Sequence, residues 1–155
     1  MKKAVPIGVD NFKELITKEY YYIDKTLLIK ELLDLQGKVN LFTRPRRFGK
    51  TLNLSMIQYF FENMQDEQLN EENRRLFDGL YIMKAGGAYT DQMGQYPVIS
   101  LTLKSANQRT FESAYFKLKE EIAEEFKRHS YLLEGTYLQD SEKELFAKIA
   151  NRKAD

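Results

Sequence analysis

Residues 39–59, VNLFTRPRRFGKTLNLSMIQY, constrain the fold more than any other part of this chain. The segment opens with a short apolar run, VNLF, which predicts a buried strand, and continues into the loop TRPRRF. Gly49, Lys50 and Thr51 then begin a stretch whose apolar residues follow helical spacing. Strand, loop, Gly-Lys-Thr and helix is the order of a phosphate-binding P-loop.

This arrangement predicts an anion site, because exposed N–H groups and the positive end of a helix dipole both favour negative charge. Lys50 would contact the outer phosphates of a nucleotide, and the Thr51 hydroxyl would be a ligand of Mg²⁺. Arg46 or Arg47 would add positive charge, or would simply face the solvent. The backbone N–H groups expected to cradle the phosphates belong to Arg46, Arg47, Phe48, Gly49, Lys50 and Thr51.

The run RPRRFGKT resembles the variant Walker A motif of the bacterial and archaeal AAA-ATPase-like proteins. The usual P-loop has a glycine where this chain has Arg44, but arginine is the normal residue there in that family. Two further stretches fit the family, YYYIDKTLLIKELL at 20–33 and QYPVISLTLK at 95–104. The resemblance implies ATP and Mg²⁺ as cofactors. It also implies a nuclease domain of the PD-(D/E)XK superfamily, which usually follows the ATPase domain and is absent from these residues.

The expected fold class is α/β, a P-loop NTPase-like three-layer α/β/α domain that is incomplete. Residues 1–155 would form one partial domain, with an N-terminal helical lead at 1–37 and the P-loop strand-helix core at 38–155. A hydrolytic P-loop enzyme also needs an acidic residue after a second core strand, the Walker B position. The two other apolar runs, LYIM and VISLTL, end in Lys84 and Lys104 instead. Hydrolysis by these residues alone is therefore not expected.

The segment YYYIDKT precedes the P-loop and has two interpretations. By resemblance to related ATPases, Tyr22, Ile23, Asp24 and Lys25 would lie on the adenine side of the nucleotide site. Alternatively, the aromatic residues fill the edge of the core and Asp24 caps a helix over residues 25–35, which would stop at Gly37.

Caps and apolar spacing predict several other elements. Asp10 or Asn11 would cap a first helix, and Ser141 would cap the last one. Residues 80–83 and 98–103 would be strands, and residues 85–94 would form a turn-rich surface segment. The further helices are expected at about residues 12–18, around 69–77, 109–128 and 142–151.

Composition limits the partners. The net charge of +1 creates no global field for nucleic acid or an acidic membrane, and no apolar run is long enough to cross a bilayer. The absence of cysteine excludes disulfides and thiolate metal sites. The start of the chain lacks an apolar signal core, so a cytoplasmic protein is expected.

The sequence is also compatible with two other functions. Arg44, Arg46 and Arg47 would contact phosphates if the chain were a nucleic-acid module of a nuclease-linked protein. Alternatively, the chain is a scaffold or oligomerisation domain. A homo-oligomer is compatible with the sequence, since an arginine finger from a neighbour cannot be told from a surface arginine. The sequence does not decide between ATP and GTP.

Overall fold

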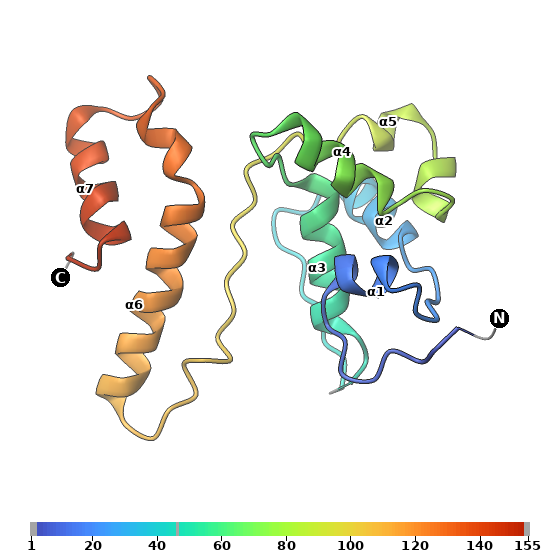
Figure 1. The fold of residues 1–155 in the computed structure, drawn as a ribbon, viewed down its shortest axis with the longest axis horizontal. Helices are drawn as coiled ribbons and strands as arrows, with labels where there is room; N and C mark the ends of the chain where they lie inside the picture. The colour runs from blue at the N-terminus through green and yellow to red at the C-terminus, as the bar shows by residue number, and fades with distance from the viewer. Residues whose placement is uncertain (1–2, 46, 154–155) are drawn as a thin grey trace. The chain divides into compact units, whose positions relative to one another are not determined.

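The computed structural model describes residues 3–45 and 47–153 of the chain. They belong to two compact units, Met1–Val98 and Ile99–Asp155, which are described separately below. Both units are built from helices, and no strand occurs in the described ranges (Figure 1).

The first unit contains the predicted P-loop and the helices that precede and follow it in the sequence. Asn11 caps the first of them by accepting a hydrogen bond from the Glu14 N–H (3.0 Å), as one of the two predicted caps. Asp66 caps α4 through the N–H groups of Gln68 and Leu69. The elements are α1 (Phe12–Thr17), α2 (Leu27–Leu35), α3 (Lys50–Phe61), α4 (Glu67–Arg75), the 3₁₀ helix η1 (Tyr81–Lys84) and α5 (Gly87–Thr90).

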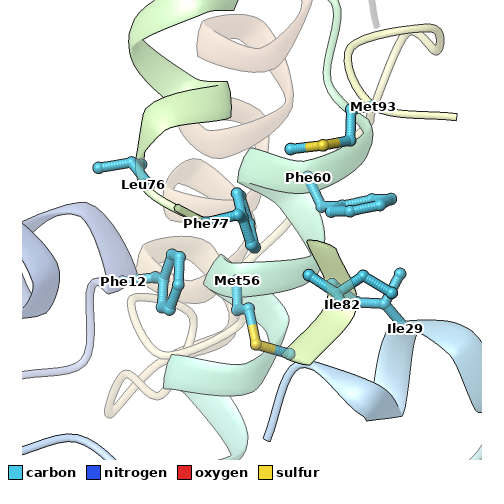
Figure 2. Close-up of a cluster of buried hydrophobic side chains, with 8 residues drawn as sticks. All are labelled: Phe12, Ile29, Met56, Phe60, Leu76, Phe77, Ile82 and Met93. Atoms are coloured by element: carbon cyan, nitrogen blue, oxygen red, sulfur yellow. The ribbon is translucent and has the colours of Figure 1, made fainter. Parts of the chain in front are cut away.

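An aromatic cluster around α3 forms the core of this unit (Figure 2). The Phe77 ring lies 5.0 Å from the Phe12 ring and 5.3 Å from the Phe60 ring, measured between centroids. Met56 and Phe60, one turn apart on α3, are both buried, so this face of the helix packs inward. Through Met56 and Phe60, helix α3 thus packs against Phe12 of α1 and Phe77 after α4.

The predicted three-layer α/β/α fold is wrong for this structure. Residues 39–42 and 99–103 have no regular secondary structure and are not paired into a sheet within the described chain. Their apolar side chains are exposed, with Val39 88% and Ile99 72% accessible. An extended segment becomes a strand only when a neighbour satisfies its N–H and C=O groups. The described residues contain an isolated bridge between Glu62 and Tyr96 instead.

The predicted strand at residues 80–83 is also wrong, because this segment forms η1. Its first N–H groups are taken by side chains: the Tyr81 N–H donates to Asp24 (2.7 Å), and the Ile82 N–H donates to the Thr26 hydroxyl (3.1 Å). These contacts replace the ladder bonds of a sheet. Part of the segment predicted as a surface turn forms α5.

Two predicted details of α2 differ from the structure. The N-cap residue is Thr26 rather than Asp24, although Asp24 does accept a hydrogen bond from the Thr26 N–H (2.8 Å). The helix ends in the left-handed residue Gln36, with φ of 47°, one residue before the predicted stop at Gly37.

The second unit contains α6 (Phe111–Arg128), the 3₁₀ helix η2 (Ser130–Leu133) and α7 (Asp140–Ala150). Helices α6 and α7 pack together through Phe126 and Phe146, whose ring centroids are 4.8 Å apart. The long helix was predicted, but much of its apolar face stays exposed, including Phe111 at 77%. The predicted Ser141 cap is wrong: Gln139 and Glu142 form a capping box at the start of α7.

Candidate functional site

The loop before α3 adopts an unusual backbone conformation. Arg47 and Gly49 both have positive φ angles, 70° and 73°. Gly49 is the N-cap of α3, and any other residue type would be strained in this conformation. Arg46 lies outside the described residues. Alternating conformations of this kind turn successive N–H groups toward one side of a loop, which is the basis of backbone anion sites.

The N-terminus of α3 supplies further N–H groups. The helix begins at Lys50, and its first closing hydrogen bond is donated by the Asn53 N–H to the Gly49 carbonyl (2.9 Å). The N–H groups of Lys50, Thr51 and Leu52 have no residue four positions earlier in the helix to accept from them. No side chain caps them in the described part of the chain, since the N-cap is a glycine. This end of α3 therefore favours an anion.

The Lys50 ammonium group folds back over the loop. It donates to the Arg44 carbonyl oxygen and lies 3.4 Å from the Pro45 carbonyl oxygen. The side chain is exposed, so it can exchange these carbonyls for a stronger acceptor such as a phosphate. The Lys50 ammonium group thus lies beside the backbone carbonyls of the loop.

A cavity of about 760 Å³ opens beside the loop in the first unit. Its volume is within the usual range for small-molecule sites. Of the residues predicted for the nucleotide site, Lys25, Phe48, Lys50 and Thr51 line it. Lys25 lies just before α2, Phe48 lies in the loop before α3, and Lys50 and Thr51 lie at the start of α3. The structure therefore brings together residues that are far apart in the sequence.

The other predicted adenine-side residues do not line this cavity. The Tyr22 hydroxyl accepts from the Lys25 N–H (3.2 Å) and donates to the Met56 sulfur (3.4 Å). Burial raises the pKa of Tyr22. Asp24 bonds to Thr26 and Tyr81, and Ile23 is 65% exposed. Tyr22 packs against the core, as the packing interpretation of YYYIDKT predicts, but Asp24 is not the helix cap of that interpretation. Lys25 lines the cavity.

The cavity also contains residues that the sequence did not single out. Leu28 and Glu31 line it from α2, and Leu54 and Ile57 line it from α3. The two residues of each pair are three positions apart and so share one face of their helix. This spacing, in helices next to the predicted P-loop in the sequence, is the pattern from which they could have been predicted.

Metal ligands are sparse in the described residues. No group of three or more His, Cys, Asp or Glu side chains is close enough to hold a metal ion there. The Thr51 hydroxyl is exposed at the first turn of α3. It fits a Mg²⁺ ion whose other ligands are phosphate oxygens and water, the arrangement that Mg²⁺ prefers. Across the same ranges, no helix combines the length and apolar character required to cross a membrane.

Comparisons with known proteins identify a family. The profile of the AAA-ATPase-like family, described as "Predicted AAA-ATPase", matches residues 6–155. The "Uncharacterized protein in vnfD 5'region" of Azotobacter chroococcum mcd 1 is 35% identical over 82 residues, which are 52% of this chain. The match spans only 14% of that relative's length. No solved structure is similar to the chain at a significant level.

Proposed function

We propose that this chain, which belongs to the AAA-ATPase-like family, binds ATP with Mg²⁺ through the loop before α3 and the cavity beside it. The observation that carries the proposal is the convergence of the loop, Lys50 and Thr51 on one cavity that also reaches Lys25. Lys50 would leave the carbonyls of Arg44 and Pro45 and contact the outer phosphates. The N–H groups of Gly49, Lys50 and Thr51 would bind the phosphate oxygens.

The residues present fit the group they would hold. An anionic triphosphate needs N–H donors and cations, and the cationic side chains of Lys25, Arg44 and Lys50 line the described part of the cavity. Bound Mg²⁺ would neutralise phosphate charge, with Thr51 as its protein ligand. The proposal is limited to binding, because Lys84 and Lys104 stand where the sequence would place a Walker B acid. We take residues 1–155 to be the nucleotide-binding part of a longer ATPase.

A calorimetric titration of Mg-ATP into the wild-type protein and Lys50→Ala tests this function. A hydrogen bond to a charged group contributes about 1.5–3 kcal/mol, so we expect affinity to fall roughly 10- to 150-fold in the variant. Lys38→Ala is the matched control, because Lys38 is an exposed lysine of the same unit that does not line the cavity. Its affinity for Mg-ATP is expected to equal that of the wild type.

Two results would contradict the proposal. The first is the absence of binding by a wild-type protein whose circular dichroism confirms its helices. The second is equal binding by the wild type and Lys50→Ala. A titration with duplex DNA over a series of salt concentrations covers the nucleic-acid alternative. Affinity for DNA that falls steeply with salt and is insensitive to Lys50→Ala would favour phosphate contacts by Arg44 and Arg47.

A further inference from the structure

The cavity beside the loop has an apolar wall that the phosphate contacts do not use. Leu28 on α2 and Leu54 and Ile57 on α3 line it. Leu54 is 56% exposed, which leaves apolar surface in contact with water next to a loop that attracts anions. Burial of such surface by a flat apolar group is favourable, at about 25 cal/mol for each Å² removed from water.

The apolar wall extends away from the anion-binding end of the cavity. Ile57 is seven residues after Lys50 in α3, which corresponds to about 10 Å along the helix axis. A nucleotide whose phosphates are at Lys50 would extend its ribose and base away from them. The wall therefore lies in the part of the cavity where a base has room.

Among the described residues that line this cavity, Glu31 is the one acidic side chain, beside the cationic Lys25, Arg44 and Lys50. It is exposed and has no hydrogen bond or ion pair with the rest of the described chain. A carboxylate repels phosphates but accepts hydrogen bonds from N–H groups. Leu28 precedes Glu31 by three positions on the same face of α2, so a base that packs on Leu28 would present its edge to the carboxylate.

We propose that Leu28, Leu54 and Ile57 contact the faces of a purine, and that Glu31 accepts a hydrogen bond from its exocyclic amino group. The site would then select nucleotides of amino-purines over those of hypoxanthine. This inference rests on the proposed function, since it assumes that the phosphates bind at the loop. Glu31 would be a specificity-determining residue and would take no part in phosphate binding.

Inosine triphosphate is the probe for the amino group, and its ribose and phosphates are those of ATP and GTP. It differs from GTP only by the missing 2-amino group. Compared with ATP, it has a 6-oxo group in place of the 6-amino group and an N1–H in place of the N1 acceptor, so its 6-oxo edge repels a carboxylate that the 6-amino group would donate to. Calorimetric titrations with the three Mg-nucleotides are expected to give the wild type a roughly tenfold preference for ATP or GTP over ITP. Glu31→Met keeps the size of the side chain and removes the acceptor. Its preference is expected to fall to about one, without loss of ITP affinity.

A control variant and the dependence of binding on Lys50 separate the failure of this inference from that of the proposed function. Glu19→Gln changes an exposed carboxylate outside the cavity and is expected to keep the wild-type preference. Equal, Lys50-dependent binding of the three nucleotides by the wild type would overturn the inference alone. A preference for ATP or GTP over ITP that survives Glu31→Met would also overturn it. So would a preference for ATP over 2′-deoxy-ATP that Glu31→Met abolishes, because that result assigns Glu31 to the ribose. No binding of any nucleotide would overturn both proposals.

Discussion

Removal of the Thr26 hydroxyl tests why residues 80–83 form a 3₁₀ helix. Thr26 is fully buried, and its hydroxyl accepts from the Ile82 N–H (3.1 Å) while it donates to Asp24 (2.7 Å). Thr26→Val keeps the shape of the side chain and leaves the Ile82 N–H buried without an acceptor. An unsatisfied buried donor costs about 1–3 kcal/mol. Asp24 is half-buried and keeps its hydrogen bonds from the Thr26 and Tyr81 N–H groups. The hydrogen bond that Asp24 loses from the Thr26 hydroxyl therefore adds little to the cost.

We therefore expect Thr26→Val to lower the free energy of unfolding by about 2 kcal/mol, measured by urea denaturation with circular dichroism. The Ile82 amide should also exchange its hydrogen faster than in the wild type. Thr26→Ser is the matched control: it keeps the hydroxyl, loses one methyl group worth about 0.8 kcal/mol, and should leave Ile82 protected. If Thr26→Val is as stable as the wild type and Ile82 stays protected, the reasoning about η1 is refuted.

Three further substitutions test contacts within the individual units. Phe77→Ala removes a ring that contacts both Phe12 and Phe60, so the free energy of unfolding should fall by about 3–5 kcal/mol in urea, and a loss under 1 kcal/mol would contradict the core described above. Asn73→Leu should raise the urea midpoint by the equivalent of about 1 kcal/mol, because the Nδ2 group of the buried Asn73 has no acceptor in the described chain; a lower midpoint would indicate that it is satisfied in solution. Burial opposes ionisation of Glu125, but the Arg128 guanidinium and the Ser100 N–H hold its pKa below the ordinary 4.5. A carboxylate whose pKa is lower in the folded than in the unfolded state stabilises the fold above the unfolded-state pKa, and this stability is lost as the pH falls through the folded-state pKa. Glu125→Gln removes this group, so the loss of stability below pH 4.5 should be shallower in the variant. Identical acid titrations of the two proteins would contradict this.

The sequence predicted most helices of this chain because their signals are local. Apolar spacing identified α3 and α6, and the side chain of Asn11 marked the start of α1 as expected. These features depend on residues a few positions apart, which a sequence shows directly. Gln139 was missed as a cap because Ser141 was the more usual cap residue and lay two positions away.

The predicted strands were wrong because a sheet depends on partners distant in the sequence, which a local pattern does not show. Val39 and Ile99 belong to runs with strong β-propensity, yet neither run forms a ladder of hydrogen bonds within the described residues. Ile82 also belongs to an apolar run, but Asp24 and Thr26, more than fifty positions earlier, fix that run as η1. Tertiary contacts overrode local preference in this case.

The sequence singled out part of the candidate site for the same reason. Gly49, Lys50 and Thr51 were predicted from a motif whose residues are adjacent, and Lys50 and Thr51 line the cavity. Glu31 and Leu28 were not predicted, since only the packing of the chain places them at the cavity that Lys50 and Thr51 line. A motif locates the phosphate end of such a site, whereas the remaining walls depend on the fold.

The most direct test of the account is to follow the backbone amides of the ¹⁵N-labelled protein by NMR while Mg-ATP is added. If the loop and the start of α3 bind the phosphates, the largest shifts belong to the amides of Gly49, Lys50 and Thr51, and those of α6 stay in place. Lys50→Ala should need more nucleotide to reach the same shifts. Shifts that are absent, or that centre on residues outside the loop and its cavity, would contradict the central claim that this P-loop is a nucleotide site.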